Sequence, residues 1–241
     1  MEATGEGAQD VRAALSRIEA AVTRGETDLR VLGFWPVVAL VKRGPALIEA
    51  HADQIGRIDE AAFRARVRPV LPVWAGNVLL GGLFVAGGAA LWVASATHGL
   101  IAGLALVAAA LWWSVAVHSP THWLVGLALG IRCTHYFLGG PFPQRPGLKT
   151  DYASYLRVPA RSRAWFHASG ALATKTAPFL VAACAPLTNA PVWAILAAAG
   201  VGVIEIATDV LFSVKTGDWK KFRREMAIAR SVADPGSAPT F

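Results

Sequence analysis

One long stretch of the chain carries no charge. From Pro69 to Ile131 there is no Asp, Glu, Lys or Arg. A membrane-spanning helix needs roughly 20 apolar residues, so this stretch predicts two spans, at about Val70–Ser95 and Gly99–Val117. Two further apolar stretches, Ala164–Leu187 and Pro191–Val214, predict a third and a fourth span. The pattern therefore predicts an all-α, polytopic membrane protein with four transmembrane helices.

The residues before the first span predict a helical region. Apolar side chains recur there at spacings of four, three and four residues, which places them on one face of an amphipathic helix; they are Val11, Leu15, Ile18 and Val22. Gly25 is a plausible end of this helix. The apolar run Val31–Val41 is too short to cross a membrane, and Pro45–Gly56 and Ile58–Val67 predict two more short helices.

Three parts follow from this pattern. Residues 1–68 form a cytoplasmic helical region, and residues 69–214 form the transmembrane domain with a cytoplasmic loop at 132–163. Residues 215–241 form a basic tail, and its Pro/Gly/Ser-rich end has the composition of a disordered segment.

The positive charges predict how the chain lies in the membrane. The net charge is +7, and 22 of the 23 Lys and Arg residues lie in the N-terminal region, the central loop or the tail. Because basic loops stay on the cytoplasmic side, both termini and the central loop are expected in the cytoplasm. These residues flank apolar spans, so we expect a multi-pass protein of the plasma membrane whose partner is the lipid bilayer and not nucleic acid.

Two histidines and an aspartate predict a metal site near the cytoplasmic face. His118 and His122 are four residues apart, roughly one helical turn, and follow the second span. Asp209 lies five residues before the end of the fourth span, at a similar depth. Two imidazoles and one carboxylate suit zinc with an open fourth position. Near a membrane surface the same histidines can simply contact lipid headgroups. Ser119-Pro120 also resembles the start of a new helix, which would separate the two rings.

Two further ionisable residues, Lys175 and Glu205, lie nearer the middle of the predicted spans. Charges inside a membrane are costly and usually functional. An ion pair between the third and fourth spans would satisfy both, or the two could line a polar active-site cavity. Glu205 is four residues before Asp209, so both can face the bundle interior.

The region from about 95 to 215 resembles the site-2 proteases, a family of intramembrane zinc metalloproteases. His118-Ser-Pro-Thr-His122, followed by Gly126 and Gly130, is similar to their His-Glu-x-x-His helix. Gly170-Ala-Leu-Ala-Thr174 stands where they carry Gly-Pro-x-x-Asn, and Asp209 stands near their third zinc ligand. The resemblance implies that His118, His122 and Asp209 bind zinc, and that the substrate or partner is a transmembrane segment.

The chain departs from that family at the catalytic position. Ser119 replaces the glutamate that takes a proton from zinc-bound water, and serine cannot act as this base. Glu205 is the candidate substitute for it. We therefore expect a divergent, metalloprotease-like protein, either a weak zinc hydrolase or a non-proteolytic relative that binds transmembrane segments. The alternative is a metal-free structural or partner-binding membrane protein.

The predicted topology can be tested with reporter fusions. Fusions after Arg145 and Phe241 should report the cytoplasm, and fusions at His98 and Asn189 should report the outside, because both short turns lack positive charge. An outside location for Arg145 would overturn the orientation and with it the cytoplasmic depth assigned to His118.

Overall fold

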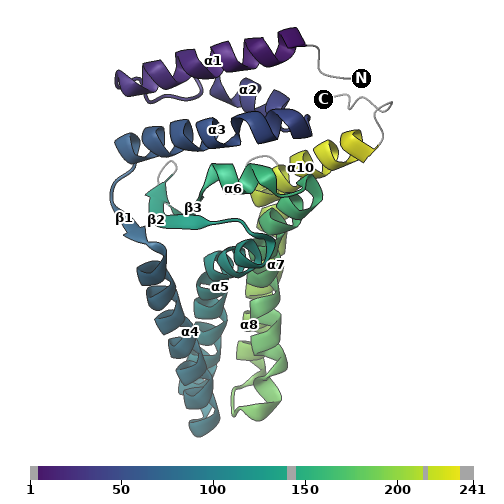
Figure 1. Cartoon of the computed structure of the whole chain (residues 1–241). Helices are drawn as coiled ribbons and strands as arrows, with labels where there is room; N and C mark the ends of the chain where they lie inside the picture. Colours follow the sequence, from purple (N-terminus) through teal and green to yellow (C-terminus); the bar gives the residue numbers. More distant parts are fainter. Residues whose placement is uncertain (1–4, 140–144, 214–216, 234–241) are drawn as a thin grey trace. The chain divides into compact units, whose positions relative to one another are not determined.

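The computed structural model describes residues 5–139, 145–213 and 217–233, and the chain is mainly helical (Figure 1). It divides into two compact units. Unit 1 comprises Met1–Pro72, Gly126–Arg163 and Arg224–Phe241, and unit 2 comprises Val73–Val125 and Ala164–Arg223. Each unit has its own core, and the two are described separately.

Unit 1 combines helices with a small sheet. Its elements are α1 (Gly5–Thr23), α2 (Phe34–Val41), α3 (Pro45–Arg66), β1 (Val70–Pro72), β2 (Cys133–Gly139), β3 (Arg145–Thr150), α6 (Tyr152–Arg157) and the C-terminal part of α10 (Asp218–Ala233). The strands form an antiparallel sheet in the order β1-β2-β3, with Val70 opposite Phe137 and Tyr136 opposite Leu148. Helices α1 and α3 lie along each other (Figure 1).

Unit 1 differs from the prediction in two places. Residues 45–66 form one continuous helix, α3, where two short helices were predicted. Gly56 lies inside this helix and packs closely against α6, where a Cβ on Gly56 would lie 2.9 Å from the Cβ of Ala153. The predicted loop at 132–163 contains two strands and a helix, since β2 pairs with β1 on one side and with β3 on the other.

The tail is helical from Asp218 to Ala233, and its Pro/Gly/Ser-rich end lies outside the described residues.

A buried ionic cluster lies in unit 1. The Glu225 carboxylate accepts from the Lys42 ammonium at 2.5 Å and from the Arg163 Nε at 2.8 Å, and all three side chains are at most 2% exposed. Burial raises the pKa of Glu225, but Lys42 and Arg163 lower it more, to about 2. Glu225 is therefore ionised. Because both cations are buried, removing this carboxylate leaves them uncompensated.

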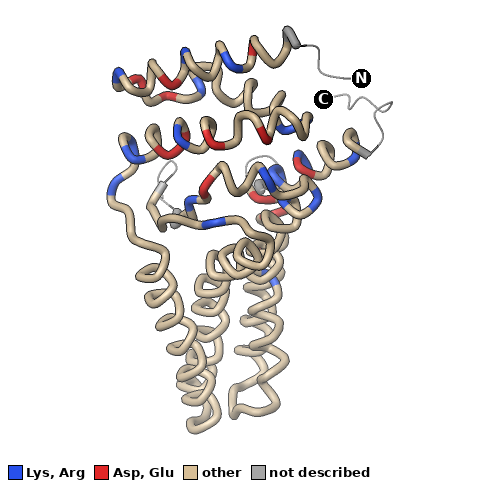
Figure 2. Tube along the Cα trace, viewed as in Figure 1, with Lys and Arg blue, Asp and Glu red and all other residues tan. Residues whose placement is uncertain are grey.

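Unit 2 is a bundle of long helices. It contains α4 (Val73–Ala96), α5 (Gly99–Leu129), most of α7 (Ala160–Ala183), the 3₁₀ turn Ala185–Leu187, α8 (Val192–Thr208), a π-helical turn at Asp209–Ser213 and the start of α10. Among the described residues, three helices are long and apolar enough to cross a membrane: α4, α5 and Val192–Leu211. Figure 2 shows that α4 and α5 carry no charged residue. The predicted third span, which corresponds to α7 and contains Lys175, is not among the three.

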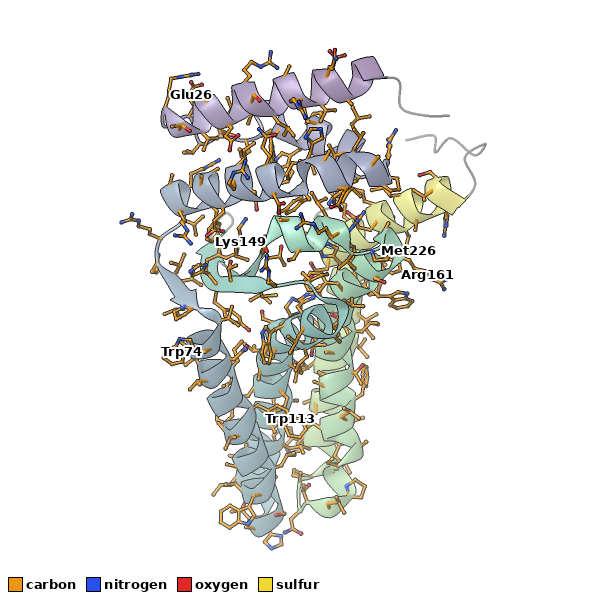
Figure 3. The ribbon with its side chains drawn as sticks, in the orientation of Figure 1. Glu26, Trp74, Trp113, Lys149, Arg161 and Met226 are labelled. Atoms are coloured by element: carbon orange, nitrogen blue, oxygen red, sulfur yellow. The ribbon has the colours of Figure 1, made fainter. Side chains whose placement is uncertain are left out.

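The core of the bundle is built from small side chains. Alanines from α4, α5 and α8 pack with Leu106 and Val181; the buried set is Ala90, Ala94, Leu106, Ala109, Ala110, Val181, Ala185, Ala194 and Ala198. Small residues let helix backbones approach closely where the surroundings are as apolar as the core. Trp113, labelled in Figure 3, stacks on Phe84 against the surface of Gly87.

Large apolar side chains of these helices point away from the core. Exposed examples include Val78, Leu79, Val85, Leu100, Leu104, Leu196 and Ile204. An exposed apolar surface of this kind suits contact with a lipid bilayer. The structure therefore supports a membrane protein with three helices, among the described residues, that are able to span a bilayer.

Replacing Glu225 with Gln should destabilise unit 1 and change its pH dependence. The loss at pH 7 should be about 3 kcal/mol, because two buried cations lose their counter-charge. The folded pKa of Glu225 is about 2, below its ordinary value of 4.5. Its contribution is thus complete above pH 4.5 and disappears as the pH falls toward 2. Thermal unfolding of the detergent-purified protein between pH 7 and pH 3 measures this.

Glu26→Gln is the control, because Glu26, labelled in Figure 3, is an exposed acid whose one ion-pair partner among the described residues is exposed Arg24. Such pairs contribute about 0–1 kcal/mol. Equal melting temperatures for Glu225→Gln and the wild type at pH 7 would contradict the structural role of the cluster.

Candidate metal centre

Helix α5 carries both histidines on one face. It continues without a break through Pro120 to Leu129, so the predicted restart at Ser119-Pro120 does not occur. Residues four apart on a helix lie one above the other, and the ring centroids of His118 and His122 are 5.0 Å apart. The two imidazoles therefore form one site. All the groups described below belong to unit 2.

A backbone carbonyl fixes the tautomer of His122. Its Nδ1 lies 2.7 Å from the carbonyl oxygen of Phe166 on α7. A carbonyl only accepts hydrogen bonds, so Nδ1 carries the proton. In the neutral ring, Nε2 then holds a lone pair. The ring itself fits against Gly170, where a Cβ would overlap its Nε2 and Cδ2 atoms.

Thr174 fixes the tautomer of His118 in the same way. The Thr174 hydroxyl donates to the carbonyl oxygen of Gly170 at 2.9 Å, which uses its single proton. The same oxygen lies 2.9 Å from His118 Nδ1, so it must accept from that nitrogen. The Nε2 of neutral His118 is also a lone pair. Both rings thus present the nitrogen that binds metals, with the other nitrogen held by the protein, as is usual for metal-binding histidines.

Asp218, the first residue of α10, faces both lone pairs. Its Oδ2 lies 3.5 Å from His118 Nε2 and 3.4 Å from His122 Nε2. Lys221 lies 3.3 Å from the other carboxylate oxygen. Burial raises the pKa of Asp218. Hydrogen bonds from the Nε2–H groups that the two histidines carry when protonated, together with the charge of Lys221, lower it more, to well below 3.8. The carboxylate is therefore an anionic acceptor.

The three acceptors fit a single small cation. One ligand atom from each of His118, His122 and Asp218 lies within 4.8 Å of the others. Two ligands of a tetrahedral zinc ion, each bound at 2.0–2.1 Å, are about 3.4 Å apart, which matches the two nitrogen–oxygen distances. With neutral rings, two lone pairs and a carboxylate would repel one another. A cation at their centre removes this repulsion.

The structure brings together two of the three residues that the sequence predicted as metal ligands. His118 and His122 belong to the cluster, but Asp209 does not. Asp209 instead pairs with Lys175 at 2.6 Å and accepts from the Trp219 indole at 2.8 Å. The Lys175 pair predicted with Glu205 is thus made with Asp209. The reason is position: Asp209 lies one turn beyond Glu205 on the fourth predicted span.

Ser119 stands at the position of the catalytic base, and Glu205 is its candidate substitute. Ser119 is buried in α5. Glu205 lies beside Ser114 and close to Lys175 and to His118, a member of the cluster. Its Oε2 is buried without a hydrogen-bond partner among the described residues. Neither residue belongs to the described group of metal-ligating side chains.

Sequence reasoning missed Asp218 and the role of Thr174. No spacing rule connects Asp218 to two histidines on a distant helix, and an acid at a helix start is ordinarily a favourable interaction with the helix dipole. Thr174 stood at a position of the protease motif and looked like a departure from it. Only the packing of α5 against α7 brings its hydroxyl to His118.

Thr174→Val should weaken zinc binding by about 10–100-fold, because partners of metal-binding histidines contribute that much to affinity. Thr176→Val is a matched control on the same helix, since its exposed hydroxyl donates to the carbonyl oxygen of Leu172 on its own helix. Zinc affinity measured by competition with a coloured chelator tests this. Equal losses in both variants would mean that the Thr174 hydroxyl does not support the site.

Comparison with known proteins gives no match: no family model, no curated protein and no solved structure matches this chain.

Proposed function

We propose that this chain is a membrane metalloprotein that binds one divalent metal ion, zinc, through His118, His122 and Asp218. The observation that carries the proposal is the convergence of two histidine lone pairs and an ionised carboxylate. Each histidine is oriented by a hydrogen bond that its Nδ1–H donates to an acceptor on α7. Such a site, when bound to zinc, supplies Lewis-acid chemistry and a coordinated water.

The protein is proposed to be a non-proteolytic relative, in its site chemistry, of the intramembrane metalloproteases. Two ligand positions agree with that resemblance, and Asp218 takes the place implied for Asp209. The general base of the protease motif is replaced by Ser119. Losing such a base costs about 10²–10⁴-fold in rate. A role in holding a transmembrane segment as substrate or partner fits this chemistry better than efficient hydrolysis.

We also propose that α7 is a fourth span, with both termini of the chain in the cytoplasm. At one end α7 contacts His122 through Phe166, and at the other Val181 packs with Leu106. His122 and Leu106 are 16 residues apart on α5, or about 24 Å at 1.5 Å per residue. Helix α7 therefore packs along α5 over a length that is most of the thickness of a bilayer core. The pairing of Lys175 with Asp209 offsets the cost of its charge in the membrane.

The competing possibility is a metal-free protein in which a proton takes the place of the ion. The distances from Asp218 to both rings would also suit an ion pair with a protonated histidine. In that case the cluster would be structural and would hold α10 to α5. Metal binding separates the two possibilities directly.

The test is the zinc content of the detergent-purified protein, measured by mass spectrometry after equilibration with zinc and removal of the excess. The wild type should hold about one ion per chain. His122→Ala and Asp218→Asn should each lose at least 90% of it, because a zinc site with an open fourth position depends on all three protein ligands. Asp209→Asn is the matched control and should retain the ion, since Asp209 pairs with Lys175.

Two results would overturn the proposal. Zinc-free wild-type protein, or equal zinc in the wild type and His122→Ala, would favour the metal-free structural alternative. Loss of zinc in Asp209→Asn with retention in Asp218→Asn would instead remove Asp218 from the ligand set.

A further inference from the structure

Unit 1 contains a cavity with a strongly positive lining. Its volume is about 530 Å³, within the range of small-molecule binding sites. Four cationic side chains and one carboxylate line it, together with apolar residues; the charged ones are Lys42, Glu49, Arg157, Arg161 and Arg163. The cavity is separate from the metal centre, because its lining belongs to unit 1.

Two of these cations are buried and only partly neutralised. Lys42 and Arg163 share a single carboxylate, Glu225, so one positive charge is left over. Arg224 adds a third cation, 3.5 Å from the same carboxylate. Burial is the main reason that the pKa of Lys42 falls to about 8. An unneutralised charge in a dry site is costly.

The guanidinium of Arg163 also keeps one nitrogen without a partner. Its Nε donates to Glu225, and its Nη1 donates to the carbonyl oxygens of Leu156 and Val158 at 3.0 and 2.7 Å. Its Nη2 is buried and has no hydrogen-bond partner within the described part of the chain. Lys42 has three N–H donors, of which one goes to Glu225. Donors and surplus charge therefore coincide at this cavity.

We propose that this cavity binds the phosphate group of a phosphate ester. A phosphate offers several oxygens to donors on separate side chains, whereas a carboxylate offers two. Lys42 and Arg163 would supply the inner donors, and exposed Arg161 a donor at the rim. The cavity is larger than an inorganic phosphate needs, and the apolar part of its lining, including Ile48, Leu156 and Val232, suits the organic part of the ester.

Two sources share this chemistry: a soluble phosphate ester and the headgroup of an anionic lipid. Glycerol 3-phosphate and phosphatidic acid carry the same glycerol phosphate, without and with acyl chains. Binding of each to the full-length protein can be measured, by calorimetry for the first and by native mass spectrometry in mixed micelles for the second. Glycerol and phosphatidylcholine are the corresponding controls without an anionic phosphate monoester.

Lys42→Met should weaken the bound ester by at least tenfold, because a buried charged hydrogen bond is lost. Arg161→Gln should weaken it about threefold, as expected of an exposed pair. Arg161 is exposed, so this variant should fold normally, and equal melting temperatures would confirm that. Arg17→Gln, an exposed arginine of α1 outside the cavity, is the control and should leave binding unchanged.

Each result of the two binding measurements either supports or overturns the proposed phosphate site. Binding of both esters, with the predicted loss in both cavity variants, supports the site with a soluble ester as ligand. Binding of phosphatidic acid alone, with the same losses, supports the site with a lipid headgroup as ligand. Binding of neither ester, or binding that Arg161→Gln and Arg17→Gln weaken equally, would overturn the proposal.

Discussion

The hydrogen bond from His122 to the carbonyl oxygen of Phe166 is the interaction on which the candidate site depends. It holds α5 against α7, and it decides which nitrogen of the ring carries the proton. Because a carbonyl cannot donate, Nδ1 carries the proton, and in the neutral ring the other nitrogen faces Asp218 as a lone pair. Thr174 repeats the same arrangement at His118. The same contacts that pack α5 against α7 therefore also orient two of the three proposed metal ligands.

Both units bury ionised side chains, but these charges are neutralised in different ways. In unit 2, Lys175 and Asp209 form a closed pair, and Asp218 is shared by two histidines and Lys221. In unit 1, Glu225 pairs with two buried cations, and Nη2 of Arg163 has no hydrogen-bond partner among the described residues. The acceptors gathered in unit 2 and the donors gathered in unit 1 are the basis of the two proposed ligands, a metal cation and a phosphate anion.

Close packing in the bundle follows from its small residues. Alanines fill the core, and glycines stand where a large ring meets a neighbouring helix, as Gly87 does at Trp113 and Gly170 at His122. At Gly170 the imidazole of His122 fills the space that a side chain would occupy. The glycine that allows close helix packing therefore also positions a proposed metal ligand.

The sequence by itself determined the membrane character of the chain, because a long run without charge admits few other environments. The spacing of His118 and His122 also predicted a shared helix face, but only the structure showed that the helix continues through Pro120 and keeps the two rings together. Only the tertiary structure decided the third acceptor. Depth along a span favoured Asp209, but a carboxylate goes to the partner that packing provides. Asp209 forms an ion pair with Lys175 on α7, whereas Asp218 at the start of α10 lies beside the two histidines. Contacts between residues far apart in the chain depend on how helices pack, and no local pattern contains that information.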